Sequence, residues 1–387
     1  MDIVTENHFF SHGSDQRSTP GQREDCHLCQ IRAFKTHRSL PITIVNHTGD
    51  GAVLPPKFRF TEQSILRDGV TPAANEFRYG CNCEDEESCM YAGCGCLDEV
   101  AGSDSEPDDV ASDEPDEEDL EILQWAASTQ ERPSWANQRR SRPGSIDDAV
   151  VPRTGYDTDA RSRKKKRFAY HSRGAKAGLL RGSMLNNSRA PIYECHDGCL
   201  CSKDGCPNRI VERGRQVPLQ IFRTEDRRGW GVKTMRPLKR GQFVDCYFGE
   251  VITADEAERR RHHASMAQRK DVYLFALDKF TDPTSRDPRL RGPPLEVDGE
   301  FTSGPTRFIN HSCEPNLRIF ARVGDLADKH IHDLALFAVK DIEKGEELTF
   351  DYVDGQEEIE NNARDAALQV EMTKCLCGSK KCRGYLW

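Results

Sequence analysis

The chain has 387 residues and a formal net charge of −9, with 36% hydrophobic and 31% charged residues. This hydrophobic content is low for the length, so we expect part of the chain to stay disordered. We find no apolar signal segment and no apolar run near the ~18 residues that a membrane span requires. We therefore expect no membrane partner and residence in the reducing cytosol or nucleus. There, sixteen cysteines bind metal or stay thiols rather than form disulfides.

The first part of the chain alternates between expected disorder and expected order. Residues 1–39 are polar with little periodicity, which predicts a flexible N-terminal tail. Within residues 40–98, the stretches 41–45 and 57–60 resemble short strands, and a first group of cysteines follows them. Residues 99–165 hold acidic residues, then Ser, Pro and Arg, without a sustained apolar pattern. We predict a disordered acidic and basic insertion there.

Order is expected to resume at residue 166, and the remaining chain is rich in short strand patterns. These patterns lie at 218–222, 243–247, 272–277, 333–339 and 347–350. Thr253 and Glu256 have the spacing of a capping box, which predicts that a helix begins there and continues to about residue 270. The predicted fold class is mainly β with short helices. We place a second cysteine module at 166–210, a catalytic domain at 211–355 and a C-terminal module at 356–387.

Nine cysteines form two spaced groups on either side of the predicted insertion. They are Cys81, Cys83, Cys89, Cys94, Cys96, Cys195, Cys199, Cys201 and Cys206. Nine thiolates do not divide into separate four-ligand sites, but they suit three tetrahedral zinc ions if three of the thiolates bridge. Such a cluster replaces a hydrophobic core and holds both ends of the insertion. Ordinary buried thiols are the alternative, which the paired C-x-C spacings disfavour.

A third group of cysteines, Cys375, Cys377 and Cys382, lies near the C-terminus. Three ligands leave one coordination position of a zinc ion open, and Cys313 is the predicted fourth ligand. This zinc would hold the last thirteen residues over the segment around Asn310. Two further cysteines, Cys26 and Cys29, form a lone C-x-x-C that could bind metal with His37, and this alternative stays open.

An ordered series of motifs resembles that of the SET-domain lysine methyltransferases. It comprises RGWG at 228–231, YFGE at 247–250, RFINHSC at 307–313, ELTFDY at 347–352 and the C-terminal CxCx4C. The nine-cysteine region resembles the pre-SET module of the suppressor-of-variegation class, which methylates lysine 9 of histone H3. The final CLCGSKKCRGYLW looks like a post-SET module. YECHDGC, VERGR and DLALFAVKDI are most similar to the filamentous-fungal, defective-in-DNA-methylation type.

The resemblance implies a pseudoknotted, β-rich SET fold that transfers methyl groups from S-adenosylmethionine to lysine 9 of histone H3. It implies a nuclear role in heterochromatin. The residues that match the family's cofactor contacts are Arg228, Gly229, Trp230, Tyr273, Arg307, Asn310 and His311, with Leu376 and Trp387 closing over the cofactor.

The same resemblance gives the catalytic residues. Tyr352 would orient the target amine and assist its proton loss, and Tyr247 would be a second phenol beside the channel. Removing that proton costs roughly 4–5 kcal/mol at pH 7 for an unperturbed lysine, and an apolar channel lowers this cost. Phe350 stands where other members have a Tyr that narrows the channel, so we predict a trimethyl product.

The histone H3 tail is expected to bind by strand addition along residues 273–278. Phe275 and Asp278 would contact the peptide, and Asp278 would meet the arginine before the target lysine. Residues 1–80 lack Trp and the aromatic pattern of a methyl-lysine reader, so we expect adaptor proteins to target the enzyme.

Several alternatives stay open. The basic run at 161–167 is a nuclear localisation signal, a DNA contact or a solvated linker. The acidic run at 104–121 binds histones, mimics nucleic acid or is a spacer. Beyond the enzyme, the chain could be a zinc-binding chromatin adaptor that has no activity, or an enzyme acting on a lysine outside histones.

Overall fold

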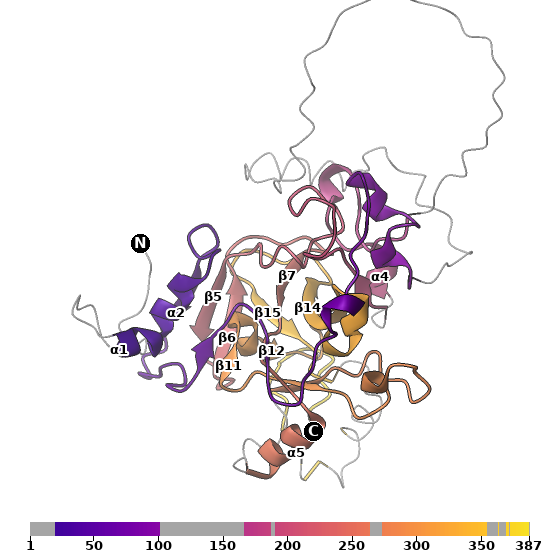
Figure 1. Cartoon of the computed structure of the whole chain (residues 1–387). Helices are drawn as coiled ribbons and strands as arrows, with labels where there is room; N and C mark the ends of the chain where they lie inside the picture. The colour runs from indigo at the N-terminus through magenta and orange to yellow at the C-terminus, as the bar shows by residue number, and fades with distance from the viewer. Residues whose placement is uncertain are drawn as a thin grey trace, which may run out of the picture.

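The computed structural model describes residues 20–100, 166–186, 190–263, 273–353, 363, 369–370 and 372–386. Within these residues, short strands pair into four sheets, and the helices lie around them (Figure 1). The α-helices are α1 (Pro20–Glu24), α2 (His27–Ala33), α4 (Gly182–Asn186) and α5 (Ala254–His263). The 3-10 turns are η1 (Asn75–Phe77), η2 (Glu87–Met90), η3 (Gly95–Leu97), η5 (Gly174–Lys176), η6 (Pro288–Leu290), η7 (Pro305–Phe308) and η8 (Leu326–Ile331). No helix among the described residues is long and apolar enough to cross a membrane.

The five-stranded sheet holds parts of three motif segments, those at 228–231, 307–313 and 347–352, and has the order β1-β5-β6-β15-β12. Its strands are β1 (Ile42–Val45), β5 (Leu219–Arg223), β6 (Trp230–Thr234), β15 (Glu347–Phe350) and β12 (Asn310–His311). The turn between the antiparallel strands β5 and β6 holds Gly229 at φ 92°, a left-handed conformation that favours glycine. The outer strands β1 and β12 run parallel to their neighbours, so distant parts of the chain meet there.

A second sheet, β4-β13-β14-β7, lies at the centre of the hydrophobic core. Its strands are β4 (Ile192–Tyr193), β13 (Leu317–Val323), β14 (Asp333–Ala338) and β7 (Phe243–Cys246). All residues from Leu334 to Ala338 are buried, as in a strand that is covered on both faces. Leu336 packs in a cluster with the five-stranded sheet, whereas Phe337 packs with the cysteine-rich segments. This sheet therefore lies between the two.

The third sheet, β3-β8-β10-β9, consists of β3 (Ile65–Leu66), β8 (Glu250–Ile252), β10 (Glu296–Asp298) and β9 (Leu274–Ala276). A two-stranded parallel pair, β2 (Arg59–Phe60) with β11 (Thr302–Ser303), completes the strands. In the third sheet β9 pairs only with β10 among the described strands, so β9 is an edge. Helix α5 packs on β10, and Arg260 joins the helix to Glu250 (2.6 Å) and Asp298 (2.7 Å).

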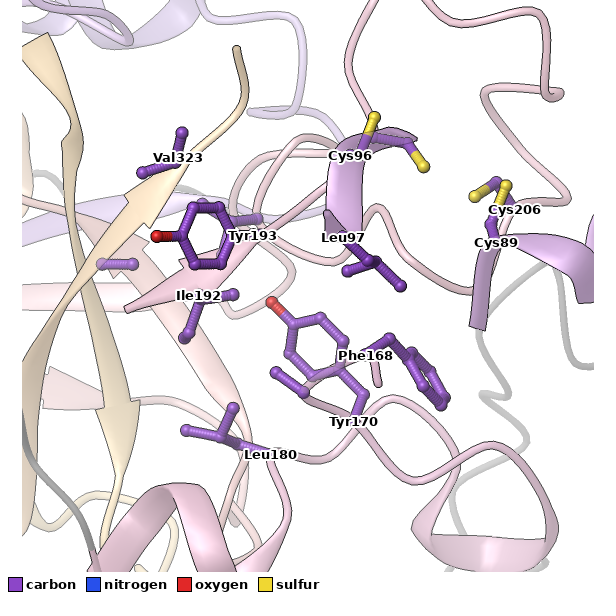
Figure 2. Close-up of a cluster of buried hydrophobic side chains, with 14 of the residues drawn as sticks. Cys89, Cys96, Leu97, Phe168, Tyr170, Leu180, Ile192, Tyr193, Cys206 and Val323 are labelled. Carbon is purple, nitrogen blue, oxygen red and sulfur yellow. The ribbon is translucent and has the colours of Figure 1, made fainter. Parts of the chain in front are cut away.

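The cysteine-rich segments form a module that shares a core with the second sheet. Figure 2 shows Leu97, Phe168, Tyr170 and Leu180 packed between the cysteine-bearing turns and the strand that ends at Val323. These apolar side chains are at most 2% exposed. The module is thus attached to the second sheet by an ordinary hydrophobic core in addition to its cysteines.

A buried carboxylate, that of Glu194, also joins the module to the second sheet. Glu194 accepts hydrogen bonds from the Tyr170 hydroxyl (2.5 Å), from Arg322 Nε on β13 (3.0 Å) and from the backbone N–H groups of residues 210–212. Arg322 is also buried and contacts Glu212 and Asp333. Removing one partner would leave an uncompensated buried charge, so this network holds the module in one position.

The expected strands agree with the structure at 41–45, 57–60, 218–222, 243–247, 272–277, 333–339 and 347–350. The strand at 347–350 has the expected bounds, and the ends of the others differ by one or two residues. Helix α5 begins after Thr253, whose Oγ accepts the Glu256 N–H at 3.3 Å. The structure describes this helix to His263. The predicted disorder at 1–19 and 101–165 lies outside the described residues, as do both the acidic run and most of the basic run.

The prediction of a flexible tail is wrong for residues 20–39. His27 and Ile31 on α2 are fully buried, and His27 Nε2 lies 2.8 Å from the Phe58 carbonyl oxygen. The His27 ring also makes edge contacts with Phe58 and Phe60. The seven residues of this helix are too few for a periodic pattern to be recognised in the sequence. The helix is held in place by its contact with Phe58, which lies more than thirty residues away along the chain.

Candidate functional site

The parallel pairing of β12 with β15 brings two of the predicted motifs together. Asn310 lies opposite Thr349, and His311 lies opposite Phe350. The Ser312 N–H continues this pairing with a hydrogen bond to the Phe350 carbonyl at 3.1 Å. Each strand is only a few residues long, so the position of its side chains depends on this pairing.

Glu347, which the sequence analysis did not single out, connects three of the predicted segments. Its carboxylate accepts two hydrogen bonds from the Arg228 guanidinium (3.1 and 2.7 Å) and one from Asn310 Nδ2 (2.9 Å). The same Asn310 amide donates to the Trp230 carbonyl (3.2 Å). Burial lowers the pKa of Arg228, but Glu347 and Asp226 outweigh this effect and raise it, so Arg228 stays charged.

The contacts of Glu347 require a glycine at position 231. A Cβ atom on Gly231 would lie 2.8 Å from Glu347 Oε1 and equally close to the Phe222 ring. The signal that could have identified Glu347 is its place as the first residue of ELTFDY, beside a strand that begins with Trp230 and Gly231.

His311 occupies the junction between the strand pair and the C-terminal cysteines. Its Nδ1 accepts the Tyr352 backbone N–H at 3.2 Å, and its Nε2 lies 3.3 Å from Cys313 Sγ. Burial lowers the pKa of His311 to about 4, so the ring is neutral near pH 7. Its two contacts suit a residue that holds the backbone, as the sequence analysis expected, rather than a general acid or base.

A row of aromatic rings leads from β7 to Tyr352. The ring centroids of Tyr247 and Phe275 lie 4.6 Å apart, those of Phe275 and Phe350 5.8 Å, and those of Phe350 and Tyr352 4.8 Å. The Tyr352 hydroxyl donates to the Ile309 carbonyl (2.7 Å), and the Tyr247 hydroxyl donates to the Tyr273 carbonyl (3.0 Å). Burial raises the pKa of both tyrosines, so both phenols are protonated at neutral pH.

Arg307 lies beside this row and stacks its guanidinium on aromatic faces. The distance from its Cζ to the ring centroid is 4.0 Å for Tyr273 and 4.7 Å for Phe308. Its Nε is buried and has no hydrogen-bond acceptor among the described residues. A buried donor without an acceptor is costly. The arrangement therefore fits a polar bound group next to Tyr273 and Asn310, as a nucleoside cofactor would provide.

The C-terminal cysteines come together with Cys313 as predicted. The sulfur atoms of Cys313, Cys375, Cys377 and Cys382 all lie within 4.8 Å of one another, and Cys313 and Cys375 are 3.9 Å apart. Sulfur ligands of one tetrahedral zinc are ~3.8 Å apart, given Zn–S bonds of about 2.3 Å. The four thiols therefore fit one zinc ion.

A second connection, made by Arg383, joins this C-terminal group to the motif segments. The Arg383 guanidinium makes two hydrogen bonds to the Asp351 carboxylate, at 2.7 and 2.6 Å. Its backbone N–H points to Cys313 Sγ at 3.3 Å. Asp351 stands between Phe350 and Tyr352, so the C-terminal module contacts the site directly. The sequence analysis placed no role on either residue.

The nine cysteines of the first two groups also lie together. Each of three sets has four sulfur atoms within 4.8 Å of one another: Cys81, Cys89, Cys195 and Cys201; Cys81, Cys96, Cys195 and Cys199; and Cys81, Cys83, Cys89 and Cys94. Cys81 belongs to all three sets, and sulfur pairs such as Cys81 and Cys195 are 3.8 Å apart. The ninth thiol, Cys206, lies beside Cys89 (Figure 2). Shared thiols are what a bridged zinc cluster requires.

The other predicted residues have different surroundings. Cys26, Cys29 and His37 belong to no set of three or more metal-binding side chains among the described residues. The additional metal site considered for the Cys26 and Cys29 pair therefore has no support. Asp278 is exposed just beyond the edge strand β9. Leu376 is 50% exposed, and Trp387 lies outside the described residues. Their predicted closing over a cofactor stays a prediction.

Comparisons with known proteins agree with this architecture. The family model of the SET domain matches residues 229–353, and that of the Pre-SET motif matches residues 34–209. The chain is 55% identical to the H3 lysine-9 specific histone-lysine N-methyltransferase dim-5 of Neurospora crassa, over 387 residues and 100% of both chains. It is 53% identical to the H3 lysine-9 specific KMT1 of Fusarium mangiferae, over 99% of this chain and 98% of that protein. A solved structure of the Neurospora SET domain protein DIM-5, a histone lysine methyltransferase, matches with a TM-score of 0.62 at 52% identity, covering 87% of this chain and 100% of that chain.

The cysteine geometry predicts the zinc content. We expect four zinc ions per chain, one for each of the four sets of cysteines, as measured by inductively coupled plasma mass spectrometry. The double variant Cys375→Ser/Cys377→Ser removes two ligands of the C-terminal set and should retain three. Cys29→Ser is the matched control and should retain four. Zinc at the full level in the double variant would contradict the C-terminal site, and loss from the control would contradict our assignment of Cys29.

Proposed function

This chain belongs to the SET-domain family of histone-lysine N-methyltransferases, and we propose that it methylates lysine 9 of histone H3 with S-adenosylmethionine, up to the trimethyl state. The observation that carries the proposal is the convergence of Arg228, Asn310 and Tyr352 around Glu347 and the row of aromatic rings. The two fungal relatives, matched over nearly their whole length, are both H3 lysine-9 specific by name. We place the enzyme in the nucleus, on chromatin, with adaptor proteins that target it.

We assign the cofactor to the region between the RGWG turn and the β12–β15 pair. Its proposed contacts are Arg228, Gly229, Trp230, Tyr273, Arg307, Asn310 and His311, with Leu376 and Trp387 as the cover. S-adenosylmethionine supplies an electrophilic methyl group on a sulfonium centre. The support from this chain is the unsatisfied Arg307 Nε and the amide of Asn310, whose position Glu347 fixes.

We assign to Tyr352 the positioning of the target amine. Its hydroxyl donates to the Ile309 carbonyl, and a phenol oxygen that donates one hydrogen bond can also accept an N–H of the lysine. Because burial raises the pKa of Tyr352, the phenol is not a base at neutral pH. We therefore propose that the lysine loses its proton to water, without the assistance from Tyr352 that the resemblance implied. The tyrosine then fixes the direction of the amine lone pair. Most of the rate enhancement would come from this alignment.

We propose that Phe350 and the adjacent phenols determine how many methyl groups the target lysine receives. Phe350 is 2% exposed and lies between Phe275 and Tyr352. It has no hydroxyl that could hold a water molecule or an amine N–H, so a methylated amine can rotate and react again. Tyr247, whose hydroxyl is taken by the Tyr273 carbonyl, would form the opposite side of the channel.

We propose that the H3 tail adds as a strand to the free edge of β9. Among the described strands β9 pairs only with β10, so a peptide strand can add at its other edge, and its residue Phe275 belongs to the aromatic row. Asp278 is exposed just beyond the strand, where a carboxylate can pair with the arginine before lysine 9. The thirteen clustered cysteines serve as zinc ligands, with three ions in the first module and one at the C-terminus.

The choice of lysine is tested on H3 tail peptides in which lysine 4, 9 or 27 is replaced by arginine. With purified protein and labelled S-adenosylmethionine, we expect transfer to every peptide except the one without lysine 9. Transfer that persists without lysine 9 would contradict the site choice. No transfer to any peptide by protein with its full zinc content would favour the non-enzymatic adaptor. Transfer to other nuclear proteins but not to H3 would favour a substrate outside histones.

Product number is tested by the variant Phe350→Tyr. The added hydroxyl narrows the channel and can hold the amine, so we expect mono- and dimethyl products where the native chain gives trimethyl, by mass spectrometry at saturating cofactor. The first methyl transfer should keep a rate within about tenfold of the native one, because only one hydrogen bond of about 1 kcal/mol is added. A native chain that stops at monomethyl would overturn the assignment of Phe350.

The role of Tyr352 is tested by the pH dependence of the rate. Lysine has a reference pKa near 10.4, so the rate at subsaturating peptide should rise about tenfold per pH unit between about pH 7 and 9. Because the pKa of Tyr352 is raised, its ionisation should not lower the rate in this range. Tyr352→Phe should reduce kcat by about 10²-fold or more and leave the slope unchanged. A slope that differs between the two proteins would show that the phenol itself titrates.

A further inference from the structure

A basic face lies on the part of the molecule that carries helix α4 (Figure 1). We define it by the segments 166–186 and 236–241, which together contain eight Lys or Arg residues and no Asp or Glu. The whole chain, in contrast, has 55 Lys and Arg against 64 Asp and Glu. Such a segregation of charge is unusual enough in an acidic protein to need a physical reason.

The two segments form one continuous surface. The Leu180 N–H donates to the Gly241 carbonyl at 2.8 Å, and Arg240 donates to the side chain of Asn186 at 3.3 Å. Arg318 on β13 adds a further cation, because it donates to the Leu185 carbonyl at 3.0 Å. In Figure 1 helix α4 of this face and helix α5 lie on different sides of the sheets.

Two cations of this face, Lys166 and Arg240, donate to neutral groups, which do not cancel their charge. Lys166 donates to the Ser172 hydroxyl (2.8 Å), and Arg240 donates to the Val339 carbonyl (3.2 Å) as well as to Asn186. The Asp341 carboxylate accepts from Lys239 at 2.9 Å. Arg173 and Arg240 are exposed, so a ligand can reach them.

From this arrangement we infer that the basic face binds the phosphate backbone of double-stranded DNA. A surface with many cations, among them Lys166 and Arg240 with neutral partners, attracts a polyanion, and affinity comes from released counterions. Single strands are bound by stacking their bases on exposed aromatic rings. The aromatic residues of these segments, Phe168 and Tyr170, are each 1% exposed, so this face offers backbone contacts only. Duplex DNA is therefore the partner that the surface fits.

DNA binding at this face would give the enzyme a second point of contact with the complex of histones and DNA that carries its substrate. A histone tail emerges beside duplex DNA, so a chain that holds DNA on one side raises the local concentration of tail at β9 on the other.

The inference is tested by fluorescence anisotropy of a labelled 30-base-pair duplex with the full-length chain. We expect binding that weakens with salt, and an affinity at least about tenfold lower for Lys166→Glu/Arg240→Glu. The slope of log affinity against log salt should fall by about 2 for two lost phosphate contacts. The matched control is Arg38→Glu/Lys57→Glu, which makes the same change of charge at two exposed cations outside this surface.

Three outcomes would overturn the inference: no binding of duplex by the native chain at low salt, equal weakening by both double variants, or tighter binding of a single strand of the same length. Methylation of a free H3 peptide should be the same for the native chain and both variants, because none of the four residues lies in the site. This readout separates a loss of DNA binding from a loss of folding or of the proposed enzyme activity.

Discussion

The parallel pairing of β12 with β15 is the constraint on which the rest of the site depends. Parallel strands cannot be joined by a tight turn, so the chain must leave β12 and return from the opposite end before β15 begins. It does so through β13, η8 and β14, which lie at the centre of the hydrophobic core. The burial of Leu336 and its neighbours therefore stabilises the positions of Asn310 and Tyr352, although Leu336 is distant from both residues in the sequence.

Within this frame the charged residues act as connectors rather than as acids or bases. Glu347 joins Arg228 to Asn310, and Arg383 joins the C-terminal module to Asp351. His311 is neutral, and Tyr352 keeps its proton. A reaction that needs in-line alignment and an uncharged amine benefits more from such fixed positions than from a strong base.

The cysteines divide into two structural roles. Nine of them lie in a module that shares a hydrophobic core with the second sheet, and the buried Glu194 and Arg322 fix its orientation. Such a pair adds little net stability compared with apolar residues, but breaking it leaves a charge in the core, so it specifies one arrangement. The other four cysteines bring the C-terminal segment beside His311 and Asp351. The first set therefore supports the fold, and the second builds part of the site.

The sequence by itself determined the strands, the cysteine groups and the motif residues, because each leaves a local pattern: alternation, C-x-C spacing, or an ordered run such as RFINHSC. It even identified Cys313 as the partner of three cysteines more than sixty residues away. Helix α2 was missed because its stability comes from Phe58 and Phe60 rather than from its own seven residues. Glu347, Arg383 and the basic face were also missed. Their significance lies in which residues come close in space, and only the packing of the sheets decides that.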